Sequence, residues 1–416
     1  MSSLVATAAP QSAAPATPYI EKGTPLFRRT SWALFVGGFA TFALLYCVQP
    51  MLPVLSAAFA LSAAQSSLVL SVSTVTLAAG LLFTGPLSDA LGRKPVMVAA
   101  LAAAALCTLL GPLMPNWHAL LAMRALLGLS LSGLVAVAMT YLSEEIHPQH
   151  LGLAMGLYIS GNAIGGMSGR VISGVLVDFC SWQAAVATLG ALALLAALLF
   201  WRLLPDSRHF RPTPLSFANL ARGLRLHLSD RGLPWLFLEA FLLMGGFVTL
   251  FNYIGYRLLA APYQLNMSLV GLLSVVYLSG TYSSTQAGAL ADRLGRPRVF
   301  WPAILVMLAG LLLTLCAPLA LVLLGMLLFA FGFFAAHSLA SSWVGRRALQ
   351  ARGQASSLYL FSYYVGSSVA GTAGGFFWQH GGWNGVGLFI AALLAVALGV
   401  ALHLTRLPPK QPAANP

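Results

Sequence analysis

Charged side chains are scarce in this sequence. Asp, Glu, Lys and Arg make up 7% of the 416 residues, whereas 59% are hydrophobic. Ordinary soluble domains carry roughly 25% charged residues. A soluble core of this size could not bury so much apolar surface, so the composition excludes a soluble globular protein and predicts one whose solvent is lipid. We interpret the net charge of +13 as a result of the membrane topology and as a source of attraction to anionic lipid. We do not expect nucleic acid as a partner.

Cysteine and the motifs of catalysis are also missing or rare. The four cysteines, Cys47, Cys107, Cys180 and Cys316, predict neither a disulfide framework nor a metal site. There is no H-E-x-x-H, no G-x-S-x-G, no pair of intramembrane aspartates and no nucleotide-binding loop. We therefore expect no enzyme of those classes, no direct use of ATP, no metal and no cofactor.

Long apolar runs are abundant. A spanning helix needs about 20 apolar residues, and twelve runs qualify. They cover residues 31–55, 66–87, 95–115, 118–141, 151–177, 183–204, 234–257, 268–290, 298–317, 319–344, 355–378 and 384–405. Alternating ten-residue strands are absent, which disfavours a transmembrane β-barrel. The sequence predicts an all-α membrane protein with twelve transmembrane helices.

The basic residues predict the orientation. Of the 22 Lys and Arg residues, 19 lie in the two tails or in loops that follow even-numbered runs, and the other loops carry none. The positive-inside rule then places both termini in the cytoplasm. Residues 1–30 are rich in Ala, Pro, Ser and Thr and are predicted to be a disordered tail. The basic loop 205–233 has an apolar stripe that predicts an interfacial helix, and 406–416 forms the second tail.

A polar loop occurs twice at half-chain distance. Its copies are Gly85-Pro-Leu-Ser-Asp89-Ala-Leu-Gly92-Arg93-Lys94-Pro95 and, 203 residues later, Gly288-Ala-Leu-Ala-Asp292-Arg293-Leu-Gly295-Arg296. Each has an acid at the end of one helix, a basic pair at the start of the next, and a glycine able to adopt positive φ. One copy alone could be a solvated loop, but two copies predict two similar halves, residues 31–204 and 234–405.

A glycine pattern also occurs twice. Gly161, Gly166 and Gly169 correspond, 205 residues later, to Gly366, Gly371 and Gly374. Small residues of this kind allow close helix contact in membranes. Arg170 corresponds to Gly375, so this buried charge belongs to one half only. We interpret such an asymmetric charge as a feature that a substrate site would add.

Four ionisable residues inside the runs are candidates for proton coupling. Arg124 lies about six residues into its run, where a charge costs at least ~2 kcal/mol; it either faces a partner or reaches the outer headgroups. Arg170 is too far from Asp178 for a helical pair, so its partner comes from another helix or from a bound anion. Glu239 is a candidate proton carrier or an interfacial carboxylate. His337 can titrate near neutrality or simply pack.

Polar and aromatic side chains on shared helix faces are candidates for a substrate cavity. Tyr46 and Gln49 lie near Pro50 and Pro53, which favour a kink beside a cavity. Gln49 could instead meet water at the outer interface. Converging aromatic and amide groups suit a weakly polar organic solute. The predicted cavity residues are Tyr46, Gln49, Tyr158, Asn162, Asn252, Tyr256, Tyr277 and Tyr363.

The repeated loop resembles the G-x-L-x-D-R-x-G-R-K signature of major facilitator superfamily transporters, with Ala90 in place of the first Arg. Residues 120–128, around Arg124, resemble the helix 4 motif of proton-coupled antiporters, except that Leu127 replaces Gln. Residues 156–170 resemble the helix 5 motif, except for Gly166 and Arg170. Three segments are similar to bacterial drug–proton antiporters and arabinose-efflux-permease-like inner-membrane proteins: Tyr46-Cys-Val-Gln-Pro50, Gly166-Met-Ser-Gly-Arg170 and Phe251-Asn-Tyr-Ile-Gly-Tyr256.

This resemblance implies two six-helix bundles around a central cavity. It implies a secondary transporter of the bacterial inner membrane, acting as a monomer by alternating access and exporting a small drug-like or sugar-like solute against protons. A proton-coupled importer or a uniporter is the alternative; a channel would need a continuous polar stripe, which is absent. The implied latch residues are Gly85, Asp89, Gly92, Arg93, Lys94, either Glu144 or Glu145, Gly288, Asp292, Arg293, Gly295 and Arg296.

Overall fold

The computed structural model describes residues 19–210, 212 and 217–407, and within them the chain is almost wholly helical. Its α-helices are α1 (Pro25–Tyr46), α2 (Leu52–Phe59), α3 (Ala63–Leu91), α4 (Arg93–Leu110), α5 (Trp117–Glu145), α6 (Leu151–Phe179), α7 (Trp182–Leu203), α8 (Phe217–Leu228), α9 (Leu233–Leu259), α10 (Met267–Leu272), α11 (Leu278–Leu294), α12 (Arg296–Thr314), α13 (Leu319–Arg347) and α14 (Arg352–Thr405). Short 3₁₀ turns η1 (Gly111–Leu113) and η2 (Leu273–Tyr277) extend α4 and connect α10 to α11. Residues 211 and 213–216 of the predicted linker and most of both predicted tails lie outside the described residues.

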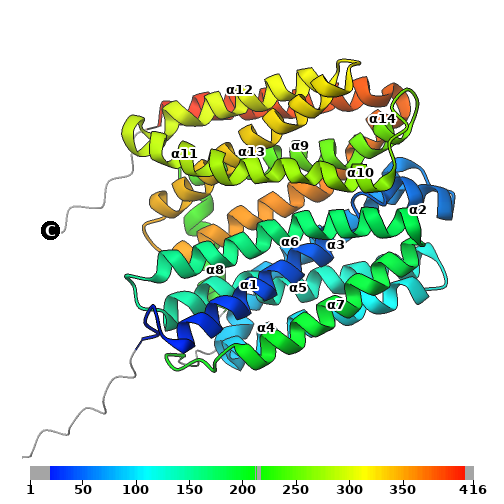
Figure 1. Cartoon of the computed structure of the whole chain (residues 1–416). Helices are drawn as coiled ribbons and strands as arrows, with labels where there is room; N and C mark the ends of the chain where they lie inside the picture. The colour runs from blue at the N-terminus through cyan, green and yellow to red at the C-terminus, as the bar shows by residue number, and fades with distance from the viewer. Residues whose placement is uncertain (1–18, 211, 213–216, 408–416) are drawn as a thin grey trace, which may run out of the picture.

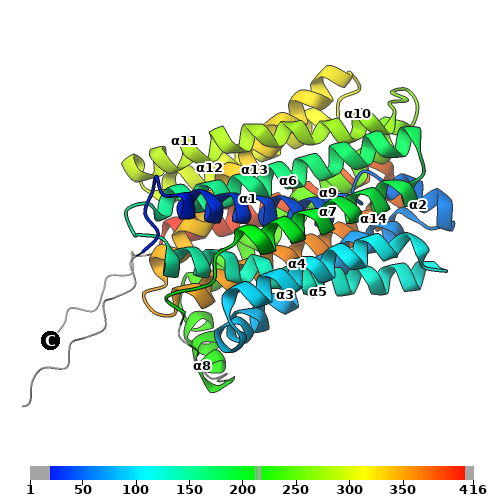
Figure 2. The same ribbon diagram turned by 60° about the horizontal axis from the view of Figure 1, so that its bottom comes forward.

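The long helices form two bundles. Helices α1 and α3–α7 pack on one another, and α9–α14 form the second group; α3 with α14 and α6 with α10 make the contacts between them. Figure 1 shows the two halves of the chain side by side, with α1 beginning and α14 ending at the same end of the molecule. Figure 2 shows α8 outside the packed helices. The predicted all-α fold of two six-helix bundles is confirmed, with α10–α11 forming one spanning unit and α14 two.

The first predicted span, 31–55, is wrong in its boundaries. Helix α1 begins at Pro25, ends at Tyr46 and is followed by a turned segment and then by α2. Pro50 lacks the N–H that would continue the helical ladder, so the backbone turns there. The ordered chain also begins before residue 31, since the Ile20 amide donates to the carbonyl of Glu145 at 2.8 Å.

The last two predicted spans, 355–378 and 384–405, also differ from the structure. Helix α14 continues through residues 379–381 and is interrupted only at Gly382, whose φ is +52°. A glycine tolerates this left-handed conformation, which makes the reversal between the two spans possible without a loop. The sequence places a turn here correctly but makes it too long.

Glycines on α6 allow a close helix contact in the first bundle. A Cβ added at Gly165 would lie 2.1 Å from the carbonyl oxygen of Phe39 on α1, and one at Gly161 would lie 2.4 Å from that of Phe35. The second bundle repeats the arrangement: a Cβ at Gly366 of α14 would lie 2.2 Å from the carbonyl oxygen of Phe241 on α9. The predicted smooth glycine face is therefore a real helix–helix interface.

Substituting Gly165 by valine is expected to destabilise the protein by roughly 1–3 kcal/mol, because the α1 backbone must move to admit the side chain. Thermal unfolding in detergent measures this. Gly156→Val on the same helix is the matched control, since a Cβ there meets nothing within 4 Å. Equal stability of the two variants would contradict the proposed close contact.

Candidate functional site

The two bundles are held together at the end opposite to the basic loops. Asp178, at the end of α6, accepts hydrogen bonds from the backbone amides of Met267 (2.9 Å) and Ser268 (2.7 Å) and from the Ser268 hydroxyl (2.5 Å). A carboxylate in this position caps the N-terminus of α10 from the other bundle. Asp178 thus joins the two halves, a role the sequence analysis did not foresee.

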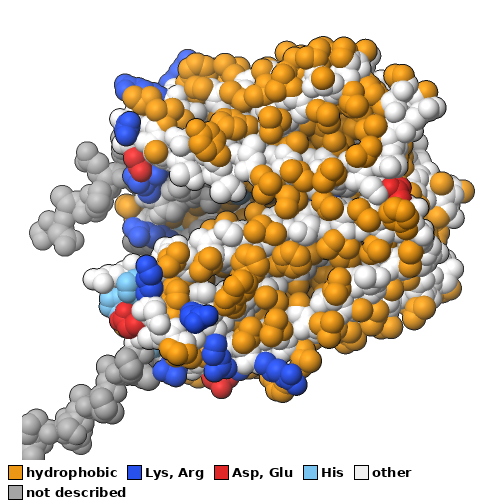
Figure 3. All heavy atoms as spheres, in the orientation of Figure 1, with side chains coloured by type: hydrophobic (Ala, Val, Ile, Leu, Met, Phe, Trp, Pro, Cys, Tyr) orange, Lys and Arg blue, Asp and Glu red, His pale blue; other side chains and the backbone are white. Residues whose placement is uncertain are grey.

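Hydroxyl groups add further contacts between the bundles. Ser368 donates to the carbonyl oxygen of Ser71 at 2.9 Å, and Thr372 donates to the Ser71 hydroxyl at 2.8 Å. Tyr256 is within hydrogen-bonding distance of two serine hydroxyls, Ser56 and Ser66. At the other end of the molecule, where Lys and Arg side chains gather, the surface is hollowed between the two halves (Figure 3). The molecule is closed at one end and open at the basic end.

Arg170 occupies the centre of the contact region. Its side chain is buried, with 6% exposure, and its Nε donates to Gln49 Oε1 at 2.6 Å while Nη1 donates to the Gly166 carbonyl at 2.7 Å. The guanidinium lies over the rings of Tyr46 (4.3 Å) and Tyr277 (4.9 Å). Two π faces and two neutral acceptors therefore surround this charge.

Gln49 connects Arg170 to the second bundle. Its Nε2 donates to Asn252 Oδ1 at 2.7 Å, so a hydrogen-bonded chain runs from α6 through the turn after α1 to α9. Gln49 is 3% exposed, so the alternative in which it merely meets water is wrong. Asn252 Nδ2 and the Tyr277 hydroxyl are buried without a hydrogen-bond partner in the described structure.

Aromatic rings of the second bundle gather beside Tyr277. Phe247 lies 5.2 Å from Tyr277 and 3.9 Å from Phe333, and Phe333 stacks on His337 at 5.7 Å. Tyr363 is 4.8 Å from His337, measured between ring centroids. The predicted residues Tyr46, Tyr277, Tyr363 and His337 therefore fall in one aromatic region shared by both halves.

Glu239 is fully buried in α9, with 0% exposure, and neither carboxyl oxygen has a hydrogen-bond partner among the described residues. The alternative of an interfacial carboxylate is therefore wrong. In the same bundle, the Tyr359 hydroxyl is 2.9 Å from His337 Nδ1. Glu239 and the Tyr359–His337 pair are thus buried ionisable groups of the second bundle.

Arg124 has a different environment. Its three guanidinium nitrogens donate to the carbonyl oxygens of Val69 (2.9 Å), Leu44 (3.1 Å) and Leu45 (2.8 Å). The residue is 5% exposed, so it does not extend to the outer headgroups. It binds the last carbonyls of α1, which the break before α2 leaves without helical partners.

Other predicted cavity residues lie elsewhere. Tyr158 and Asn162 face α1, where a Cβ at Gly38 would lie 2.1 Å from Asn162 Oδ1 and 3.1 Å from the Tyr158 ring. Tyr256 belongs to the contacts that close one end. Their assignment to a substrate cavity remains a prediction.

The first copy of the repeated loop folds around Arg93. Its guanidinium pairs with Asp89, bonds Ser88 Oγ at 2.6 Å and makes two bonds to Glu144, at 2.6 and 3.0 Å. Gly92 adopts φ +99°, as the motif requires. Glu145, the alternative partner, instead accepts from the backbone amides of Arg208 and His209.

Two further residues of the first copy have separate roles. Lys94 pairs with Asp206 of the linker at 3.0 Å. Gly85 has open space where a side chain would be, and so does Gly288 in the second copy, so close packing does not require glycine at either position.

The second copy is weaker. Asp292 is 61% exposed and faces two cations, Arg296 at 3.7 Å and Arg346 at 3.3 Å. No second carboxylate joins this cluster in the described structure, whereas Arg93 has two. Gly295 has φ +86°, and Arg293 is exposed. The two clusters therefore differ in strength, because exposed ion pairs contribute roughly 0–1 kcal/mol.

We expect Arg93→Gln to destabilise the protein by about 2–3 kcal/mol, because it leaves the partners of a buried cation unpaired. Arg296→Gln, the matched substitution in the second copy, should change stability by less than about 1 kcal/mol. Chemical unfolding in detergent compares them. Equal effects would contradict the difference between the two clusters.

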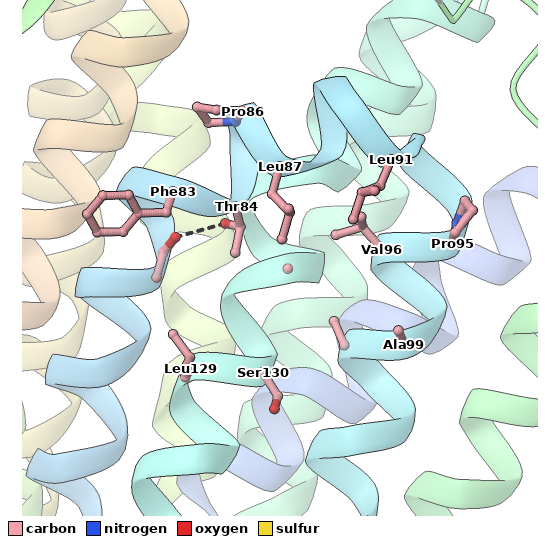
Figure 4. Close-up of a pocket in the computed structure, with 13 residues that line it drawn as sticks. Phe83, Thr84, Pro86, Leu87, Leu91, Pro95, Val96, Ala99, Leu129 and Ser130 are labelled. Atoms are coloured by element: carbon pink, nitrogen blue, oxygen red, sulfur yellow. Dashed lines mark hydrogen bonds between the residues drawn. The ribbon is translucent and has the colours of Figure 1, made fainter. Parts of the chain in front are cut away.

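Two grooves occupy equivalent places in the two halves. One of about 640 Å³ lies between α3, α4 and α5, with mainly apolar side chains around it (Figure 4). The other, of about 370 Å³, lies between α11, α12 and α13. Their lining residues correspond at the offset of the loop motif: Gly80, Leu87 and Val96 match Ser283, Leu290 and Val299. The sequence repeat thus extends to packing, and neither groove includes the central aromatic region.

Two helical bundles that meet at one end, open at the other and bury polar groups between them define a secondary transporter. A model of the Major Facilitator Superfamily matches residues 34–348 and 236–416. The chain is 62% identical over 396 residues, covering 95% of both chains, to the inner membrane transport protein YnfM of Escherichia coli strain K12. It is 48% identical over 388 residues to the uncharacterized MFS-type transporter YybF of Bacillus subtilis strain 168, covering 93% of this chain and 96% of the relative.

Solved structures share the fold. A bacterial homologue of the human lysosomal transporter Spinster, in an inward-facing and occupied conformation, matches with a TM-score of 0.78 at 14% identity over 92% of this chain and 98% of that one. A D-xylose-proton symporter matches with a TM-score of 0.73 at 15% identity, again over 92% and 98%. The chain belongs to the Major Facilitator Superfamily. It is a multi-pass membrane transporter that takes a small-molecule substrate, and not an enzyme.

Proposed function

We propose that the protein exports a small organic solute in exchange for protons, as the resembled drug–proton and arabinose-efflux-like group would. The observation that carries this proposal is the buried Glu239, whose carboxyl oxygens have no hydrogen-bond partner among the described residues and which belongs to the same bundle as the Tyr359–His337 pair. An unpaired carboxylate in such a site is costly, so the neutral acid is the more stable form until a conformational change admits water. A group of this kind can take up a proton on one side and release it on the other.

The proposed transport cycle moves the two bundles, residues 31–204 and 234–405, about the linker 205–233. With both termini in the cytoplasm, the open basic end faces inward. Opening the outer end requires the Asp178, Ser71 and Tyr256 contacts to break. The clusters around Arg93 and Asp292 would stabilise the inner ends of the helices during that change, and a monomer suffices because both halves are in one chain.

The test is a proton-flux measurement in proteoliposomes with a pH dye inside. A panel of sugars, amino acids and amphipathic drugs is added, first without and then with an imposed gradient. A solute-triggered pH change is expected, and its sign separates an exporter from the alternative, a proton-coupled importer. Solute equilibration without any proton movement would indicate a uniporter and overturn the proposal.

A further inference from the structure

We propose that the transported solute carries a carboxylate or similar anionic group that binds Arg170, and that its body is apolar or aromatic. This inference rests on the proposed transport function, but it concerns recognition rather than coupling.

The first observation is a charge without a counter-charge. No carboxylate lies within ion-pair distance of Arg170 in the described part of the chain, and its acceptors are the neutral Gln49 amide and a backbone carbonyl. Asp178, on the same helix, is fully engaged with α10. A buried cation in a membrane protein is costly unless it pairs, and the anion that would pair with it is not part of the protein.

The second observation is unused hydrogen-bonding capacity. Nε and Nη1 of Arg170 have acceptors, whereas Nη2 has none among the described residues. The buried Tyr277 hydroxyl also lacks a partner, and its ring lies 4.9 Å from the same guanidinium. An arginine and a phenol are both donors suited to a carboxylate.

Arg124 provides the contrast within the same bundle. All three of its nitrogens donate to backbone carbonyls, so it has no free donor nitrogen for a ligand. The two buried arginines therefore differ at one nitrogen: every nitrogen of Arg124 has an acceptor, whereas Nη2 of Arg170 has none among the described residues. This difference favours Arg170 as the residue that binds an external anion.

The surroundings define the rest of the solute. Tyr46 and Tyr277 flank the guanidinium, and Phe247, Phe251 and Phe334 lie 4.9–5.9 Å from Tyr277 between ring centroids. Such a wall favours an apolar or aromatic body over a polyhydroxylated one. Anionic charge also favours export, because a potential negative inside drives an anion outward by about 2.3 kcal/mol per 100 mV.

Binding at Arg170 would also act on the closed end. The Arg170–Gln49–Asn252 chain crosses between the bundles. A carboxylate competing for the Arg170 donors would release Gln49 and weaken that connection. Recognition and opening are then linked through one residue.

The experiment measures binding to purified full-length protein in detergent, without any gradient. The probes are two carboxylates, benzoate and indole-3-acetate, and their neutral amides, benzamide and indole-3-acetamide. Wild-type protein is expected to bind each acid at least about tenfold more tightly than its amide, since a buried charged hydrogen bond is lost with the amide. Arg170→Gln should remove this preference and Arg170→Lys should keep part of it.

Tyr277→Phe, which retains the ring, should weaken acid binding more than amide binding, because the charged carboxylate is the stronger acceptor. This variant tests the inference if Arg170→Gln does not fold. Arg406→Gln, at an exposed arginine beyond the end of α14, is the control and should bind as wild type does. Equal binding of acid and amide by the wild-type protein, binding of neither, or an acid preference as large as that of the wild type in Arg170→Gln or Tyr277→Phe would overturn the inference. Acid preference without solute-triggered proton flux would instead overturn only the proton coupling.

Discussion

Replacing Glu239 by glutamine is expected to abolish proton-coupled accumulation while leaving a folded protein that still binds solute. The substitution keeps the size of the side chain and replaces the titratable carboxyl group by an amide that cannot carry a proton. Glu239 is fully buried and its oxygens have no partner in the described structure, so no ion pair is lost. Proton flux in proteoliposomes should fall to the level of empty vesicles, whereas solute exchange without a gradient should continue.

Tyr359→Phe is the companion variant for this prediction. It removes the hydroxyl that lies 2.9 Å from His337 Nδ1 and keeps the ring. If protons pass along Glu239, Tyr359 and His337, this variant should slow coupled transport without uncoupling it. Retained coupling in Glu239→Gln would remove Glu239 from the mechanism and leave the proton site elsewhere in the cavity.

The repeat and the fold class could be predicted because their causes are local in the sequence. Length and apolarity of the runs determine spanning helices, and the loop around Asp89 and its copy around Asp292 each need a glycine at one position. The structure satisfies that need at Gly92 and Gly295. The same spacing as in the repeated loop relates the residues that line the two grooves. No single one of these residues would have indicated a groove.

The ends of helices were harder to predict. Pro50 breaks the first span because it lacks an N–H, but hydropathy continues across the break into α2. Near Gly382 the hydropathy pattern breaks over several residues and suggests a loop, but the backbone leaves the helical conformation only at Gly382. Hydropathy measures solubility in lipid and does not measure whether the backbone ladder continues.

The individual hydrogen bonds that close one end between the bundles could not be predicted. Asp178 caps α10 from 89 residues away in the sequence, and Ser71 meets Thr372 across 301 residues. Each partner looks like an ordinary polar residue on its own helix. These residues close one end only because the fold brings the two halves together there. The sequence alone does not show which residues of the two halves meet.

Replacing Arg124 by methionine is expected to destabilise the protein by about 3–5 kcal/mol. The guanidinium bonds the carbonyls of Leu44 and Leu45 at the end of α1, and its third bond goes to the carbonyl of Val69 inside α3. Each α1 carbonyl that loses its donor costs roughly 1–3 kcal/mol, and the loss of the buried cation adds to this. The effect arises because α1 ends early and its last carbonyls need a donor from α5. Chemical unfolding in detergent measures the change, and Arg293→Met, at an exposed arginine, should change stability by less than about 0.5 kcal/mol.

The Arg124→Met variant, compared with Arg293→Met, separates a proton-coupling role of Arg124 from a structural one. A proton-coupling arginine would lose coupling on substitution and keep its stability, whereas a residue that holds the broken helix would lose stability first. Lysine at position 124 sharpens the test, because it retains the charge but cannot donate from three separate nitrogens to three carbonyls. If Arg124→Lys folds with wild-type stability and loses only proton coupling, the stabilisation of the end of α1 by Arg124 is not its main role. Arg124 would then be a proton-coupling residue.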